Sequence, residues 1–301
     1  MKFRAVFIGV LLSIMFVSIS HSQQDEFPVL KGPYLGQKPP GSTPRLFLPD
    51  IITEQVHSTA IFSLQGDEVY WTPMGIGKIR FMKVENGFWT QPQFLSLGGS
   101  TDAKEPCFSP DGNKLYFISL RTPNVSGYTD KKNIWYAERT SDGWGNPVLL
   151  PKVINDLDLH WSFSISDSGN LYYAGRPIGQ GNTNDIYCAE FENGRFVRRQ
   201  KLSETINTAG HEDTPFIAPD ESYLIFTRAP ANFSVNANMY ISFRNEDGTW
   251  GEPVEMTGLS TSEHELGPHL SPDGLYLFFV SFRTGRAKPY WVSADIIDDY
   301  R

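Results

Sequence analysis

Residues Pro268–Phe279 read PHLSPDGLYLFF, two apolar runs joined by an Asp-Gly turn, and this pattern decides the fold. Apolar alternation predicts β-strands, and a short Asp-Gly turn between two such runs predicts a β-hairpin. The pattern recurs at intervals of about 50 residues, a period typical of a repeat architecture. The other copies are AIFSLQGDEVYW (Ala60–Trp71), PCFSPDGNKLYF (Pro106–Phe117), SFSISDSGNLYY (Ser162–Tyr173) and PFIAPDESYLIF (Pro215–Phe226).

A second hairpin follows each of the first four copies. Its turn is Asn-Gly or Asp-Gly in every case, and an aromatic residue lies just beyond it. The four turns are Asn86-Gly87, Asp142-Gly143, Asn193-Gly194 and Asp247-Gly248. Four strands, here called a to d, in a unit repeated five times are typical of a β-propeller with one antiparallel sheet per blade. The sequence therefore predicts an all-β fold with four-stranded antiparallel blades.

The last unit lacks a strand d, because the chain ends soon after its strand c, Pro289–Ala294. Thr43–Leu48 (TPRLFL) precedes the first unit and has no hairpin partner. Pairing these two segments closes the ring and leaves no long sheet edge exposed. We therefore predict five blades, with six as the alternative if residues 23–56 form an irregular extra blade.

The N-terminal residues have the pattern of a secretory signal peptide. Lys2 and Arg4 precede an apolar run, Ala5–Val17, and small residues lead to a plausible cleavage point after Ser22. The apolar run is too short to span a membrane comfortably. We expect a signal peptide at 1–22, an extended segment at 23–42 and one propeller domain at 43–301. The protein is then secreted or periplasmic, with no membrane span after cleavage.

The charge of the chain bears on one class of partner, and its cysteine content bears on disulfide and metal sites. Lys plus Arg is 26 against 34 Asp plus Glu, a net charge of −8, and no basic run is present. A nucleic-acid partner is therefore excluded, since phosphate binding needs clustered cations. Cys107 and Cys188 fit neither a disulfide framework nor a metal motif. Both fall in predicted strands, so we interpret them as buried thiols, with a disulfide as the alternative.

The strings FSPDGNKLYF, APDESYLIF and LSPDGLYLFF resemble the Pro-Asp-Gly repeat of TolB-like β-propellers, also called WD-like repeats. The resemblance covers roughly residues 57–294. It implies the propeller fold but leaves function open, because propellers of this group include partner-binding modules, sensors and some enzymes. The TolB-like group implies a protein-binding role in the periplasm.

One set of polar residues lies just before strand a, or at its start, in all five units and includes four of the six histidines. The set comprises His57, Asp102, His160, His211, Glu212, His264 and Glu265. In a propeller these positions share one face, so we expect imidazole and carboxylate groups around the channel mouth. Such groups ligate divalent metals or perform acid–base chemistry. The alternative is that they cap loops and bond to neighbouring blades.

A second polar set follows strand b in four units: Arg121, Arg176, Arg228 and Arg283. Pointing inward, these guanidinium groups would form a cationic collar that suits carboxylate or phosphate ligands. The alternative is that each arginine pairs with an acid or a carbonyl of its own blade.

Two functional hypotheses follow. The first is an exported, non-catalytic module that binds a protein partner or a small anionic or carbohydrate ligand at the channel-mouth face. It would need no cofactor, unless the first set holds a divalent metal. The second is a carbohydrate-active enzyme, a uronate-glycan lyase or a glycoside hydrolase, since some propeller lyases share this repeat type. Its catalytic residues would come from His160, His211, Glu212, His264 and Glu265, and its ligand-binding residues from Asp102, His57 and the four arginines.

Overall fold

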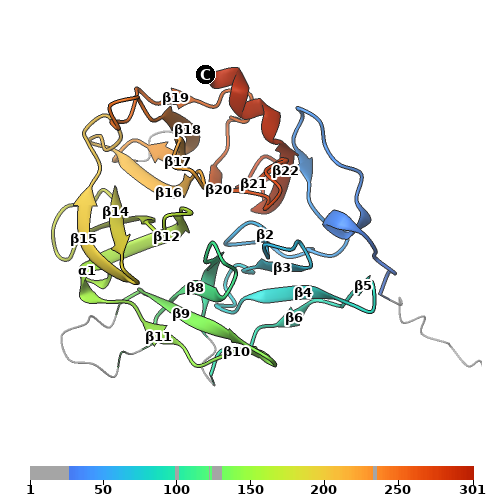
Figure 1. Cartoon of the computed structure of the whole chain (residues 1–301). Coiled ribbons are helices and arrows are strands. Elements are labelled where there is room, and N and C mark those ends of the chain that lie inside the picture. Colours follow the sequence, from blue (N-terminus) through green and yellow to red (C-terminus); the bar gives the residue numbers. More distant parts are fainter. Residues whose placement is uncertain (1–26, 99–101, 122, 124–130, 233–235) are drawn as a thin grey trace, which may run out of the picture.

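Five small antiparallel sheets stand in a ring around a common axis (Figure 1). The computed structural model describes residues 27–98, 102–121, 123, 131–232 and 236–301. The predicted signal peptide at 1–22 lies outside the described residues. The prediction of an all-β propeller with five blades is confirmed, and the alternative with six is wrong.

Each blade runs from an innermost strand a to an outermost strand d. The strands of blades 1 and 2 are β2 (Ile61–Phe62), β3 (Glu68–Trp71), β4 (Arg80–Glu85), β5 (Phe88–Trp89) and β6 (Gln93–Phe94), then β7 (Lys104–Phe108), β8 (Lys114–Ser119), β9 (Asn133–Thr140), β10 (Gly143–Trp144) and β11 (Val148–Leu149). Those of blades 3 to 5 are β12 (Leu157–Ile165), β13 (Leu171–Pro177), β14 (Asp185–Glu192) and β15 (Arg195–Lys201), β16 (His211–Ile217), β17 (Tyr223–Ala229), β18 (Asn238–Phe243) and β19 (Val254–Glu255), then β20 (Glu265–Leu270), β21 (Tyr276–Ser281), β22 (Lys288–Ser293) and β1 (Arg45–Leu46).

Strand d is divided into two pieces in blades 1 and 2. β5 and β6 both pair with β4, and β10 and β11 both pair with β9. Each first piece closes the Asn-Gly or Asp-Gly hairpin, and each second piece follows a proline, Pro92 or Pro147, which has no N–H to donate to a ladder. Each of the two blades therefore contains five strands rather than the four predicted.

The N-terminal strand closes the ring as predicted. β1 pairs antiparallel with β22, with Arg45 opposite Trp291 and Leu46 opposite Tyr290. The segment before β1 contains a short 3-10 helix, η1 (Pro33–Gly36), and packs along blade 1, where the Trp89 indole donates to the Gly32 carbonyl at 3.0 Å. The other helices are also short: α1 (Lys152–Asn155) and the 3-10 helix η2 (Ala294–Tyr300). No helix among the described residues is long and apolar enough to cross a membrane.

The core lies between neighbouring blades. Strand-b aromatics of the repeat, including Phe117, Phe226 and Phe279, are fully buried there, as expected for side chains at the contact between packed sheets. Cys107 and Cys188 are free, buried thiols, so the prediction for the cysteines is confirmed.

Candidate functional site

A β-bulge interrupts the innermost strand of blades 2 to 5 and points side chains at the axis. The register with strand b shifts after Lys104, His160, Asp213 and Leu266. The residue that follows each shift has a left-handed backbone, with φ of 54° at Glu105, 53° at Trp161, 49° at Thr214 and 59° at Gly267. Bulges re-aim side chains, and strained backbone of this kind is concentrated at functional sites.

The position just before the bulge carries three of the polar side chains at the channel. His160 lies opposite Ala174, and Asp213 lies opposite Thr227 at the equivalent place in the next blade. His57 occupies this place in blade 1, where its N–H donates to the Thr72 carbonyl at 2.7 Å. The fold therefore gathers residues from distant parts of the chain around the axis.

Two histidine–carboxylate pairs flank the indole of Trp161. On one side the His57 ring stacks on the indole, with ring centroids 4.7 Å apart, and its Nδ1 contacts the buried carboxylate of Glu105. On the other side the indole Nε1 donates to His160 Nε2 at 2.8 Å, and His160 Nδ1 lies 2.9 Å from Asp213 Oδ1. Since an indole N–H only donates, His160 Nε2 carries no proton and Nδ1–H donates to Asp213.

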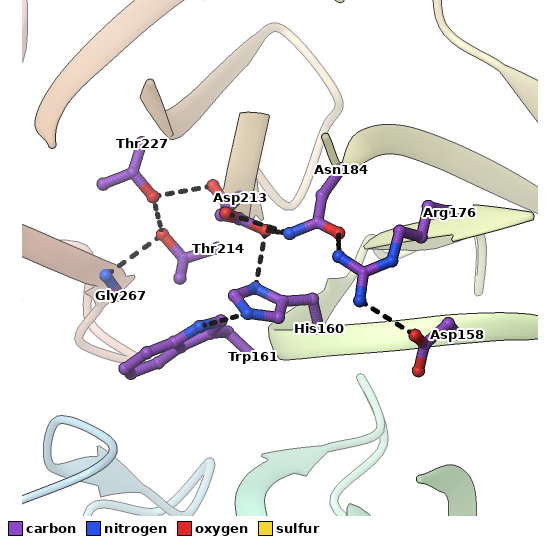
Figure 2. Close-up of polar contacts among 9 residues, drawn as sticks. All are labelled: Asp158, His160, Trp161, Arg176, Asn184, Asp213, Thr214, Thr227 and Gly267. Carbon is purple, nitrogen blue, oxygen red and sulfur yellow. Dashed lines mark hydrogen bonds and ion pairs between the residues drawn. The ribbon is translucent and has the colours of Figure 1, made fainter. Parts of the chain in front are cut away.

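Figure 2 shows how this chain of contacts continues into the adjacent blades. Asn184 donates to Asp213 Oδ1 at 3.0 Å and accepts from Arg176, whose guanidinium is paired with Asp158 at 3.0 Å. The Thr227 hydroxyl donates to the Asp213 carbonyl at 2.9 Å. The network connects blades 3 and 4 and fixes the carboxylate that orients His160.

A pocket of about 450 Å³ opens beside this network, between the innermost strands of blades 3, 4 and 5. Its polar lining consists of His160, Trp161, His211, Asp213, Asn236 and His264, together with two threonines, and its apolar lining includes Leu266 and Phe282. His264 Nδ1 accepts from the Ala237 N–H at 3.0 Å, which leaves Nε2–H to donate elsewhere. The pocket has an aromatic wall, donors, and a carboxylate.

The structure brings together three of the five predicted catalytic candidates, His160, His211 and His264, around that pocket. Glu212 and Glu265 are not part of its lining, because successive residues of a strand point to opposite faces. Both glutamates are fully buried, and each is hydrogen-bonded to the threonine four residues before it, Thr208 or Thr261. Burial raises the pKa of Glu265, although Thr261, Arg283 and Ser281 oppose the shift.

The four predicted arginines are each held by groups of their own blade or of the loop that enters it. Arg228 binds Glu212 at 3.0 Å and Arg283 binds Glu265 at 3.2 Å, while Arg176 binds Asp158. Arg121, Arg228 and Arg283 also donate to carbonyls of the preceding loops, those of Leu97, Ile206 and Leu259. None of the four belongs to the lining of the pocket that the histidines share.

Asp102, the remaining predicted ligand-binding residue, caps the end of β8. Its carboxylate accepts from the Leu120 N–H, and its carbonyl accepts from the Ser119 hydroxyl at 2.6 Å. The described residues contain no group of three or more His, Cys, Asp or Glu side chains placed to hold a metal ion.

Four residues near the axis escaped the sequence analysis: Glu105, Lys132, Trp161 and Asp213. Lys132 is half-buried, and its pKa is lowered by burial and by Lys104, with Glu105, Asp158 and Asp213 opposing the shift. The others lie at or beside the bulge, one or two residues before the predicted copies that begin at Pro106, Ser162 and Pro215, and no role was predicted for them. One feature of the sequence did mark this position. Gly267 in blade 5 aligns with Glu105 and Thr214, and each of these three residues directly precedes the repeat proline.

No protein-family model matches this sequence, and no curated protein matches it. Solved structures share the fold. TolB from Acinetobacter baumannii superimposes with a TM-score of 0.51 at 15% identity, covering 79% of this chain and 51% of that chain. An endo-arabinase from Bacteroides thetaiotaomicron gives a TM-score of 0.50 at 15% identity, covering 85% and 96% of the respective chains. A chain of a nidogen–laminin complex gives 0.50 at 12% identity, covering 76% and 73%.

These similarities agree with the class of protein that the structure defines, a β-propeller, and its five sheets give it five blades. The resemblance to TolB-like propellers is confirmed as a likeness of fold, although this chain spans about half of the TolB structure. At such low sequence identity the neighbours define the architecture alone.

Proposed function

We propose that this protein is an exported, non-catalytic binding module that takes a small neutral carbohydrate in the channel-mouth pocket. One observation carries the proposal: Trp161 borders the pocket and is held there by its hydrogen bond to His160, its stacking on His57 and its own constrained backbone. An aromatic group fixed before the ligand arrives loses little freedom on binding, which favours affinity.

The composition of the lining supports a sugar as the ligand. Sugars present an apolar ring face and hydroxyl groups that both donate and accept. Trp161 and Phe282 supply aromatic surface, Asp213 supplies acceptors, and Asn236 and His264 supply further polar groups. The described lining contains no lysine or arginine, so a carboxylate or phosphate ligand has no cationic partner there.

A binding role is favoured over catalysis by the state of the candidate residues. Both ring nitrogens of His160 are engaged, one with Trp161 and one with Asp213, so neither is free to move a substrate proton. Glu212 and Glu265 are held in buried ion pairs away from the pocket. Of the five catalytic candidates, His211 and His264 then remain in the pocket, and catalysis would have to rest on them.

Export is part of the proposal and has its own test. It is supported by the charged start and apolar run of residues 1–22. Expressed in a bacterial host, the full chain should be found outside the cytoplasm with a mature N-terminus at residue 23. Intact Met1 on cytoplasmic protein would contradict export without affecting the ligand proposal.

Calorimetric titration tests the ligand. Neutral arabino-, xylo- and gluco-oligosaccharides and trigalacturonate would be titrated into wild type, Trp161→Gly and Trp144→Phe, a control at the outer edge of blade 2. We expect a neutral oligosaccharide to bind without product formation, and Trp161→Gly to weaken binding about thirtyfold, as removal of a central aromatic contact does. If Trp161→Gly bound the sugar as tightly as wild type does, the pocket would not be the binding site. Cleavage of trigalacturonate would establish the enzyme hypothesis instead.

A further inference from the structure

The hydrogen bond between Trp161 and His160 exists in only one protonation state of the imidazole. Indole Nε1–H is a donor, and His160 Nε2 accepts from it at 2.8 Å. In the imidazolium form both ring nitrogens carry protons and both donate. Nδ1–H would still bind Asp213, but Nε2–H would then face the indole N–H, and the bond to Trp161 would be lost.

We propose that His160 is a positioning residue that holds the Trp161 indole only while its imidazole is neutral, so that acidification releases the indole. Histidine is the side chain that changes charge between about pH 5 and 8.

The partners on the other face of the indole respond differently to protonation. The His57 ring stacks on Trp161 and contacts Glu105. A protonated imidazole keeps both contacts, because a cation is attracted to an indole face and to a carboxylate. Acidification thus removes the His160 restraint selectively.

The other ionisable groups around His160 are few, and they can be separated by mutation. Asp213, His211 and His264 line the same pocket. Beyond Asn184 lie Arg176 and Asp158, which are paired with each other. Lys132 acts on Asp213, and Glu105 lies across the indole with His57. Among these groups only His160 accepts from the indole N–H.

The consequence for ligand binding rests on the proposed function. When only the neutral form is competent, the apparent dissociation constant rises in inverse proportion to the neutral fraction. One pH unit below the midpoint about a tenth of His160 is neutral, so we expect about a tenfold weaker affinity there.

The direct test needs no ligand. The Nε1–H resonance of Trp161, assigned with Trp161→Phe, would be followed by NMR from pH 8 to pH 5 in wild type, His160→Gln and His57→Gln. Glutamine offers an amide acceptor and donor but does not titrate, so the two variants are matched. We expect the resonance to titrate in wild type and in His57→Gln, and to stay constant in His160→Gln.

The outcomes separate this proposal from the proposed function. A constant wild-type resonance, or titration that persists in His160→Gln and disappears in His57→Gln, would overturn the role of His160. A titrating indole combined with no sugar binding at any pH would leave that role intact and refute the carbohydrate ligand. Once a sugar that binds is identified, the tenfold loss of affinity on acidification should occur in wild type and be absent in His160→Gln.

Discussion

Leu46 near the N-terminus lies directly opposite Tyr290 of the last blade, so the first strand of the chain completes the last sheet. The connection is reinforced beside this pair by Lys288. Its Nζ donates to the carbonyls of Ile52, Thr53 and Glu54 at 3.1, 2.6 and 2.9 Å. One ammonium group thus ties the last blade to the loop that leads into the first.

Lys288→Met should weaken this closure. The substitution keeps the aliphatic stem but removes three hydrogen bonds to carbonyl groups, for which we expect a loss of about 2 kcal/mol in the free energy of unfolding. Urea denaturation measures the loss. Lys38→Met, at an exposed site in the N-terminal segment, is the control and should change stability by less than about 0.5 kcal/mol. Equal effects of the two substitutions would show that Lys288 does not stabilise the closure of the ring.

Arg228→Met should destabilise the fold rather than the ligand site. It leaves the carboxylate of Glu212 buried without its cation, and breaking a buried pair costs about 3 kcal/mol or more. The double variant Arg228→Met/Glu212→Gln should recover part of that loss in urea denaturation. Its sugar affinity should equal that of wild type, and a tenfold fall would revive the cationic collar as a binding element.

His269→Phe should alter how stability depends on pH. Burial lowers the pKa of His269 to about 4, and Phe216 holds the equivalent ladder position in blade 4. An unfolded histidine titrates near 6.5, so below that pH the unfolded state takes up the proton more readily. The histidine thus contributes stability above about pH 6.5, and the contribution is lost as the pH falls towards 4.

The variant lacks this proton uptake. Since the His269 ring is still partly accessible, we expect wild type to lose roughly 1–2 kcal/mol relative to His269→Phe between pH 7 and pH 4.5. Urea denaturation at the two pH values measures the difference. Parallel losses in the two proteins would show that the histidine does not titrate across this range.

Trp161→Gly and Trp161→Ala should differ in stability although both remove the indole. The backbone at Trp161 has a φ of 53°, which glycine adopts without steric cost and alanine does not. We expect the glycine variant to be more stable than the alanine variant by about 1 kcal/mol in thermal unfolding. The opposite order would show that the bulge relaxes in the absence of the tryptophan.

Sequence periodicity was enough to predict the propeller, because each blade repeats the same alternation and the same Asp-Gly or Asn-Gly turns. The missing strand d of the last unit also predicted that Thr43–Leu48 would pair with Pro289–Ala294, as observed. The split outer strands of blades 1 and 2 were not predicted, since runs as short as Gln93–Phe94 carry no periodic signal.

The candidate site was predictable only in part. The histidines that precede strand a do meet at one face, but the alternation that places Asp213 beside His211 and directs Glu212 away depends on where the strand begins. A bulge adds a residue and reverses the alternation beyond it, so Trp161 could not be assigned to the channel from spacing alone. The arginines recur in the sequence because each blade holds its own in a similar way.

The most direct test of the binding site is a crystal structure with the tightest-binding neutral oligosaccharide. We predict a sugar ring against Trp161, with hydroxyl groups hydrogen-bonded to Asp213 and His264. Sugar density on the face of the propeller opposite the pocket, or only along the outer edges of the blades, would contradict this prediction.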